Sequence, residues 1–387
     1  MASIPELLDG KGVCICAGSG GVGKTTTSAA IAAGMAASGL KVCVLTIDPA
    51  KRLADSLGLP ELGNEERQVD PALLGADGDG ELWAMMLDAK ATFDEVVRKH
   101  APDAETRDRI LSNRIYQQLS SALAGSQEYM AMEKLFEIHA EGRYDLLVLD
   151  TPPSRNALDF LEAPQRLTQF IEGRALQVFM KPTGLGMKVF GRGTSVMFSV
   201  LRRITGVDLL EDLAEFFQAF SGMVSGFRER ARRVNELLAD PATSFLVVCA
   251  PQGEPISEAV HFHRKLVSAG MPFVGVIVNK VHYEARIDTG ETAEPGELED
   301  GLRTAFGGGD DNDDLAARVA ANFADFRALS ERDRANVEHL AAELRTRAVI
   351  EVPYLDDDVH DLAGLMEVNR YLFASGAPER ERIAAGA

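Results

Sequence analysis

Short apolar runs alternate with segments of helical periodicity along most of the chain. The runs have the length and the apolar content of buried strands, and they cover residues 13–17, 42–47, 82–87, 146–149, 245–250, 273–278 and 349–352. Strands that alternate with helices are typical of a parallel sheet with helices packed on its faces. The pattern therefore predicts an α/β fold with a doubly wound, mostly parallel sheet.

Several of these runs end in a glycine or a polar residue. In open parallel sheets, ligands bind outside the carboxyl ends of the strands, which lie along one rim. We therefore expect a ligand site near the residues that follow the runs, namely Gly18, Asp48, Asp88, Asp150, Gln252 and Asn279.

A phosphate-binding motif follows the first run. The segment Gly18-Ser-Gly-Gly-Val-Gly-Lys-Thr25 matches G-x-x-x-x-G-K-S/T and precedes a helical pattern over residues 26–38. Its glycines let backbone N–H groups surround phosphate oxygens, and the positive end of the helix dipole points at them. The motif predicts the P-loop of a nucleotide site, built from Gly18, Ser19, Gly20, Gly21, Val22, Gly23, Lys24, Thr25 and Thr26.

Four polar residues are candidates for the chemistry of this site. We expect Lys24 to face solvent and the phosphates, and the hydroxyl of Thr25 to bind Mg²⁺, which prefers hard oxygen ligands. Asp150 fits a Walker B carboxylate that holds Mg²⁺, and the less favoured alternative is a cap on the next helix. Asp48 can orient or deprotonate the attacking water, or it can serve only the turn of its Asp-Pro pair.

The strand pattern is interrupted twice. Helical periodicity replaces it in the middle of the chain, which predicts an inserted helical subdomain. A later segment is acidic and has too few apolar residues to offset its ordering entropy, so we expect a mobile loop there, followed by a helix over residues 315–347. The predicted parts are a nucleotide-binding core of residues 1–159 and 241–373, the helical subdomain 160–240, the acidic loop 284–314 within the core, and a disordered tail 374–387.

Phenylalanine and methionine gather in the helical subdomain, between Phe160 and Phe227. Such side chains can form an adaptable apolar groove for a hydrophobic partner. They can also pack the subdomain itself or a dimer interface, and we favour this interpretation because an inserted subdomain needs a core of its own.

Charge and cysteine content narrow the function classes. The net charge of −19 argues against binding to nucleic acid or to an anionic membrane surface. The four cysteines lie inside apolar runs and lack C-x-x-C spacing, which predicts buried thiols instead of a metal site. No secretory signal or membrane-spanning run is apparent, so we expect a cytoplasmic protein.

Four motifs together resemble the family of arsenite-pump ATPases and tail-anchored-protein targeting ATPases. They are Gly20-Gly-Val-Gly-Lys-Thr-Thr26, Asp48-Pro-Ala50, Asp150-Thr-Pro-Pro-Ser154 and Val276-Ile-Val-Asn279. In addition, Ala124-Gly-Ser-Gln-Glu-Tyr-Met-Ala-Met-Glu133 is similar to the version found in actinobacterial anion-transporter-type ATPases. The resemblance implies a doubly wound sheet with a helical subdomain, and a dimer that binds ATP and Mg²⁺ at its shared face.

The resemblance also implies roles for single residues. Asp48 matches the aspartate that positions water, and Asp150 begins a switch segment that continues through Asn156. Asn279 matches the residue that reads adenine, and Pro353-Tyr354 falls in the loop that packs on the base. The sequence itself says only that the amide of Asn279 ends a buried strand, where it can also cap a loop.

One position departs from the family pattern. Ser19 stands where the family has a signature lysine that reaches the partner's phosphates. Loss of such a cation commonly lowers hydrolysis rates by orders of magnitude. A substitute cation can come from Lys51, Arg52 or Arg155, or from a paralogous partner chain. The cysteines that some members use for arsenite or zinc also lack counterparts, so soft-metal transport is not expected.

Three functions follow in order of preference. The first is a Mg²⁺-dependent ATPase that acts as a dimeric, nucleotide-driven switch coupled to a hydrophobic or membrane-associated client. The second is a slow or inactive regulatory subunit in a heterodimer with a lysine-bearing paralogue. The third is an ATPase subunit that energises anion export.

Overall fold

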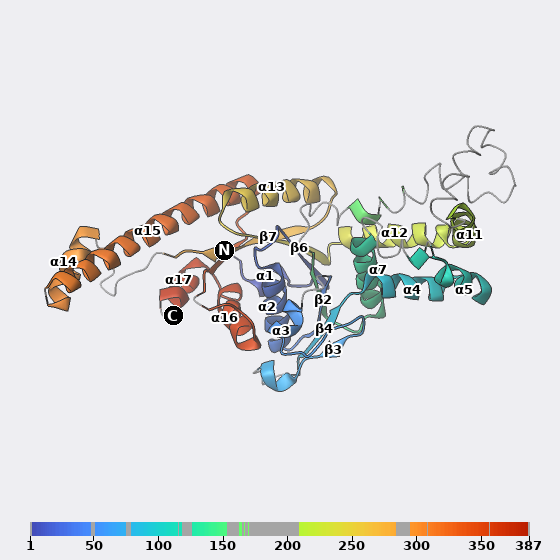
Figure 1. Cartoon of the computed structure of the whole chain (residues 1–387), viewed down its shortest axis with the longest axis horizontal. Helices are drawn as coiled ribbons and strands as arrows, with labels where there is room; N and C mark the ends of the chain where they lie inside the picture. Colours follow the sequence, from blue (N-terminus) through green and yellow to red (C-terminus); the bar gives the residue numbers. More distant parts are fainter. Residues whose placement is uncertain are drawn as a thin grey trace.

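The structure is a computed structural model that describes residues 2–47, 51–74, 79–114, 116–117, 126–152, 162–164, 166, 169, 209–283, 295–307, 309–355 and 357–385. Its strands form one sheet in the order β3-β4-β2-β5-β1-β6-β7-β8 (Figure 1). All neighbouring strands pair in parallel except β3 and β4, so the predicted fold class is confirmed. The strands are β1 Val13–Ala17, β2 Lys41–Thr46, β3 Arg67–Gln68, β4 Glu81–Met86, β5 Leu146–Asp150, β6 Thr243–Cys249, β7 Phe273–Val281 and β8 Val349–Pro353.

Helices cover both faces of the sheet, α2 and α16 on one and α7, α12, α13 and α15 on the other (Figure 1). Alternate residues of one strand therefore enter different cores. In β1, Val13 and Ile15 belong to the cluster under α7 and α12, whereas Cys14 and Cys16 belong to the cluster under α2. The helices are α1 Ile4–Leu7, α2 Lys24–Ala37, α3 Arg52–Ser56, α4 Ala89–His100, α5 Ala104–Ser112, α7 Ser126–Glu141, α11 Leu209–Ser221, α12 Val224–Ala239, α13 Gly253–Ser268, α14 Pro295–Phe306, α15 Asp310–Leu344, α16 Leu362–Leu372 and α17 Ala377–Ala385, with a 3₁₀ turn at Pro71–Leu74.

The central strand β1 lies between β5 and β6, and the chain order reverses at this point. β1 leads through α2 to β2 on one side, whereas β6, β7 and β8 continue on the other side. Crevices form at such reversals outside the carboxyl ends of the strands. The fold thus places the loop after β1 where ligands of doubly wound sheets bind.

The acidic segment does not form the mobile loop that the sequence predicted. Residues 295–306 form α14, and the acidic run from Asp310 to Asp314 is the first turn of α15. Carboxylates near a helix N-terminus are stabilised by the helix dipole, and Arg303 pairs with Glu299 one turn earlier in α14. The two helices pack as a hairpin that projects from the sheet (Figure 1), while residues 284–294 lie outside the described residues. The helix expected over residues 315–347 is confirmed as part of α15.

The tail after residue 374 also differs from its prediction, because it forms α17. Arg380 docks this helix: it is 1% exposed and donates hydrogen bonds to the carbonyls of Tyr371, Ala374 and Ala2. The acceptor on Ala2 lies at the other end of the chain, so the local sequence carries no sign of it.

Part of the predicted helical subdomain is described, as α11 and α12. Its aromatic side chains Phe216, Phe220 and Phe227 are buried and pack on Phe93 of α4 and on one another. For these residues the packing interpretation holds. Residues 171–208, which carry most of the other phenylalanines and methionines of this segment, lie outside the described residues.

The segment that resembles the actinobacterial ATPases lies mainly in α7, and two of its side chains have structural partners. Tyr129 is fully buried and donates to Glu133 at 2.9 Å, and Glu133 pairs with Arg230 of α12 at 2.9 Å. Burial raises the pKa of Glu133, while the charge of Arg230 opposes this effect. The motif thus ties α7 to the helical subdomain.

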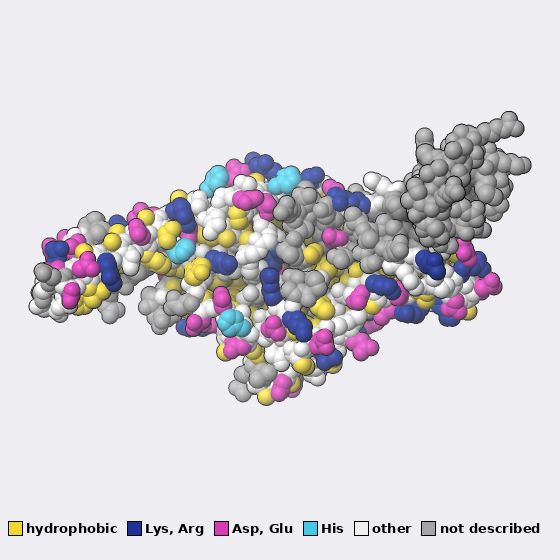
Figure 2. All heavy atoms as spheres, viewed as in Figure 1, with side chains coloured by type: hydrophobic (Ala, Val, Ile, Leu, Met, Phe, Trp, Pro, Cys, Tyr) yellow, Lys and Arg dark blue, Asp and Glu magenta, His cyan; other side chains and the backbone are white. Residues whose placement is uncertain are grey.

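On the face shown in Figure 2, Lys and Arg side chains are scattered among Asp and Glu and form no large basic area. None of the helices in the described part of the chain combines the length and the hydrophobicity that a bilayer crossing needs.

Candidate nucleotide site

The P-loop packs too tightly for side chains at two of its glycines. A Cβ at Gly18 would lie 1.9 Å from the carbonyl oxygen of Val248 in β6. Gly23 caps α2 with φ +93°, and a Cβ there would lie 2.3 Å from the amide nitrogen of Asn279. Both positions require glycine because neighbouring atoms leave no room for a Cβ. Gly23 also requires it because its backbone is in the left-handed region. The loop sits on the ends of β6 and β7 as a result.

Lys24 does not face solvent, contrary to the expectation from the sequence. It is 5% exposed, and its ammonium donates a hydrogen bond to the carbonyl oxygen of Ser19 at 2.7 Å. A buried ammonium needs acceptors, and the curled loop supplies one within its own backbone. The side chain thus lies inside the loop, where phosphate oxygens can compete for the same ammonium.

The two residues predicted to bind Mg²⁺ lie in contact. Thr25 Oγ1 donates to Asp150 Oδ2 at 2.7 Å, and Thr46 Oγ1 donates to the same oxygen at 2.9 Å. Asp150 is fully buried at the end of β5, where the sheet register places it beside Thr46 of β2 and Cys16 of β1. A hydroxyl and a carboxylate are hard oxygen ligands, so this pair fits Mg²⁺.

Thr46 escaped the sequence analysis. It ends β2 two positions before Asp48, and a hydroxyl at the end of a buried apolar strand was the available signal. Its side chain is 1% exposed, and its bond to Asp150 fixes the orientation of the carboxylate toward Thr25.

Asn279 and Lys280 at the end of β7 bind the P-loop directly. Asn279 Nδ2 donates to the carbonyl of Val22 at 2.9 Å, and Lys280 Nζ donates to the carbonyl of Gly21 at 3.1 Å. Asn279 Oδ1 accepts the backbone N–H of Lys280 at 3.0 Å. The sequence allowed two roles for the amide of Asn279, recognition of adenine and capping of a loop. In the structure this amide holds the P-loop. Lys280 was not singled out from the sequence.

The side chain of Ser19 contacts a carboxylate. The Ser19 hydroxyl donates a hydrogen bond to Glu258, which lies on α13. Where the related family has a cation, this chain therefore holds a serine bonded to an acid.

Pro353 and Tyr354 lie at the end of β8, beside the end of β7. Pro353 pairs with Val281, and the N–H of Tyr354 donates to the carbonyl of Val281 at 2.9 Å. The Tyr354 ring is 61% exposed and stacks on His282, with ring centroids 5.6 Å apart. The loop predicted to pack on the base is thus adjacent to the Asn279 segment.

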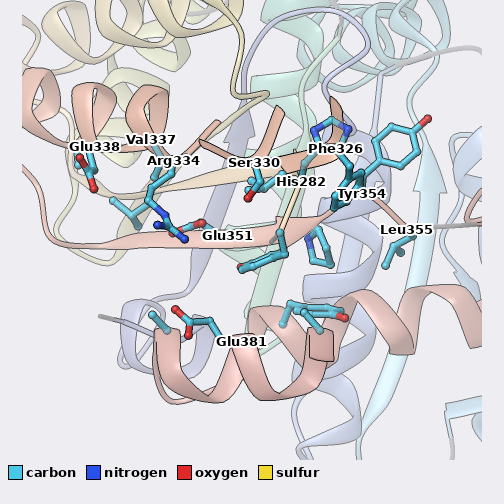
Figure 3. Close-up of a pocket in the computed structure, with 18 of the residues that line it drawn as sticks. His282, Phe326, Ser330, Arg334, Val337, Glu338, Glu351, Tyr354, Leu355 and Glu381 are labelled. Carbon is cyan, nitrogen blue, oxygen red and sulfur yellow. The ribbon is translucent and has the colours of Figure 1, made fainter. Parts of the chain in front are cut away.

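Pro353 and Tyr354 line a pocket of about 950 Å³ between α15, β8 and α17, and Tyr354 lies at one end of it beside His282 (Figure 3). Three carboxylates, of Glu338, Glu351 and Glu381, lie toward its other end, together with Arg334. Burial raises the pKa of Glu351, and the charges of Arg380 and Arg334 oppose this effect. No P-loop residue is among those that line the pocket.

The remaining predicted site residues are placed elsewhere or lie outside the described residues. Asp88 caps α4, since its carboxylate accepts the N–H of Ala91 at 2.9 Å. Lys51 and Arg52 lie exposed at the start of α3. Asp48, Arg155 and Asn156 lie outside the described residues, so their predicted roles stay predictions.

Comparisons with known proteins agree with this geometry. The model of a family described as anion-transporting ATPase matches residues 12–295. An arsenical pump-driving ATPase of Aquifex aeolicus is 29% identical over 272 residues, which are 70% of this chain and 63% of that protein, slightly under two thirds of its length. The proteins named ATPase GET3 of Malassezia globosa and of Kluyveromyces lactis are 27% and 25% identical, over 73% and 71% of this chain and 76% and 73% of their own lengths.

Proposed function

Because the chain belongs to the anion-transporting ATPase family and is a P-loop ATPase, we propose that it hydrolyses ATP with Mg²⁺. We propose further that this hydrolysis drives a dimeric switch, which is coupled to a hydrophobic or membrane-associated client. The observation that carries the Mg²⁺ part is the contact between Thr25 Oγ1 and Asp150 Oδ2 at 2.7 Å. These two residues would hold the ion, which would supply positive charge to offset part of the charge of the phosphates.

Lys24 provides the second part of the proposal. Its ammonium donates a hydrogen bond to a neutral carbonyl of its own loop, that of Ser19. A phosphate oxygen is a stronger acceptor because the hydrogen bond is then assisted by charge on both partners. A bound ATP would therefore offer Lys24 a stronger acceptor than the carbonyl of Ser19.

The nucleotide affects the rest of the chain through residues that meet at the loop. Asn279, Lys280 and Glu258 connect it to β7 and α13, and Thr25 connects it to β5. A switch needs different contacts in its two nucleotide states, and these connections are where ATP and ADP can differ. We assign the water-positioning role to Asp48 and expect the dimer to share its nucleotide face.

The Mg²⁺ site is tested by comparing Thr25→Ala with Thr25→Ser. Serine retains the hydroxyl, so Thr25→Ser is expected to keep most of the activity, whereas Thr25→Ala should lose at least about tenfold in MgATP turnover. Binding of ATP with and without Mg²⁺, followed by calorimetry, separates the ion from the nucleotide. Equal turnover in both variants would remove Thr25 from the metal site.

The dimer and the client are tested together. Light scattering should show a dimer whose stability changes between ADP and a non-hydrolysable ATP analogue, and an apolar helical peptide should bind one of the two states more tightly. A charge-interrupted peptide of equal length is the control. A monomer in every nucleotide state that ignores both peptides would contradict the switch.

Arsenite transport is not favoured, although one relative is named as an arsenical pump-driving ATPase. All four cysteines are free and buried in strands. Burial raises the pKa of Cys249 to about 12 and raises the pKa of Cys43 as well, so these thiols stay protonated at neutral pH. A soft metalloid needs accessible thiolates, which these cysteines do not offer.

A second candidate function, the regulatory subunit of a heterodimer, is favoured by the hydrogen bond between Ser19 and Glu258. This contact puts negative charge where hydrolysis needs positive charge. If the chain depends on a lysine-bearing paralogue, the purified homodimer is slow and Ser19→Lys accelerates it, provided that Glu258 now pairs with the new lysine. Rapid hydrolysis by the unmodified homodimer, with no gain from Ser19→Lys or from any partner, would exclude this function.

A further inference from the structure

Lys280 adopts a backbone conformation that lysine normally avoids. Its φ is +64°, in the left-handed region, and among the described non-glycine residues it shares a positive φ with Arg345 alone. A side chain with a Cβ is disfavoured there, and such residues persist where their surroundings hold them, often at functional sites. Glycine would fit this backbone without strain, so the presence of lysine indicates that its side chain is used.

The surroundings that hold Lys280 are the P-loop and Asn279. The register between β7 and β8 shifts between Val278 and Val281, which gives the chain an irregular turn at this point. Asn279 Oδ1 accepts the Lys280 N–H, and the two side chains then reach two consecutive P-loop carbonyls, those of Val22 and Gly21. Two successive residues of one strand end thus fasten two successive residues of the phosphate loop.

Burial does not explain this arrangement. Lys280 is exposed, and a solvent-accessible bond from an ammonium to a neutral carbonyl adds little to folding stability. The ammonium is fixed at Gly21 while its Cα lies at the end of β7, so the hydrocarbon stem spans the gap between β7 and the loop. On the other side of β7, Pro353 and Tyr354 are paired with Val281. Lys280 thus stands between the P-loop carbonyl that its ammonium contacts and the strand end that carries the proposed base-packing loop.

We propose that Lys280 is a nucleotide-positioning residue, which clamps the P-loop through Gly21 and offers its stem as a wall for the nucleoside. This inference rests on the proposed nucleotide site and adds a residue to it. Because the clamp acts on the loop and on the nucleoside, it contributes equally to the binding affinities for ATP and for ADP. A cation for the transferring phosphate would instead favour ATP.

The test compares stability with affinity in the same variants. Lys280→Gly relieves the backbone strain, so it should raise the melting temperature by about 1–3 °C. It should nevertheless weaken binding of fluorescent ATP and ADP analogues by about tenfold each. Arg345→Gly is the matched control, because Arg345 also has a positive φ, +50°, and caps α15 at its C-terminus. This variant should gain stability without losing affinity.

A second variant separates the loss of the side chain from the added backbone flexibility of glycine. Lys280→Met retains the stem and removes the ammonium, so it should bind both nucleotides with an affinity between those of the wild type and Lys280→Gly. Unchanged affinity for both nucleotides in Lys280→Gly and Lys280→Met would overturn the proposal. A loss for ATP about tenfold larger than for ADP would also overturn it, in favour of a phosphate-binding cation. Failure of the wild-type chain to bind either nucleotide would instead overturn the proposed nucleotide site.

Discussion

A methyl group at Gly23 tests whether Asn279 holds the P-loop in place. Gly23→Ala has two costs. Left-handed backbone at φ +93° costs an alanine about 1–2 kcal/mol. The new Cβ would also lie 2.3 Å from Asn279 Nδ2, too close for any contact, so the amide must leave the carbonyl of Val22. The loss of that hydrogen bond costs about 1 kcal/mol more.

The chain offers a control in which only the first cost applies. Gly39 has φ +97°, close to the value at Gly23, and a Cβ there would meet no atom within 4 Å. We expect Gly39→Ala to lower the free energy of unfolding by about 1–2 kcal/mol and Gly23→Ala by about 2–3 kcal/mol. Nucleotide binding should weaken only in Gly23→Ala.

Denaturant unfolding of both variants, with and without Asn279→Ala, measures the difference. In the Asn279→Ala background the clash is absent, so the two glycine substitutions should cost the same. Equal costs in the wild-type background would refute the reasoning, because the contact between Gly23 and Asn279 would then carry no energy.

Three further predictions address the chemistry and the pH dependence. Lys24→Ala should abolish nucleotide binding or turnover without unfolding the chain, and calorimetry with MgATP together with circular dichroism checks both; unchanged affinity and turnover would contradict the P-loop assignment. Asp48→Asn should bind MgATP normally but hydrolyse it at least about tenfold more slowly in single turnovers, whereas an equal rate would assign Asp48 to the turn. Burial raises the pKa of Glu351, so its ionisation favours the unfolded chain, and stability falls as pH rises above the ordinary value of 4.5. Glu351→Gln should therefore be more stable than the wild type at about pH 7 and similar to it at about pH 4, as measured by denaturant unfolding, and equal stability at both pH values would contradict this.

The sequence by itself determined the fold class and the identity of the phosphate loop. Apolar runs that alternate with helical patterns specify a parallel sheet because strands buried on both faces must be largely apolar, as β1 and the first four residues of β5 are. The P-loop is readable because its nine residues are contiguous, and their local conformation depends mainly on glycines and on the start of α2. The sequence also identified Asp150 as a candidate Mg²⁺ ligand, since a carboxylate at the end of a buried strand has few other roles.

Local sequence failed where a distant part of the chain stabilises a segment. The tail was predicted to be disordered from its composition, yet Arg380 docks it as α17 through the carbonyl of Ala2, at the other end of the chain. The acidic segment was predicted to be a loop, yet it forms α14 and the first turn of α15, and these two consecutive helices pack on one another. In both cases part of the packing partner lies outside the segment itself, on Ala2 for the tail and in the body of α15 for α14.

Only the tertiary structure decided what surrounds the phosphate loop. Glu258 is 239 positions from Ser19, and Lys280 is 259 positions from Gly21, so no spacing rule connects them. The pairing of β1 with β5 and β6, and of β6 with β7, brings these residues to one rim. Register and strand order come from the packing of the entire sheet, and for that reason the clamp at Lys280, the acid beside Ser19 and the buried position of Lys24 emerge only when the chain is folded.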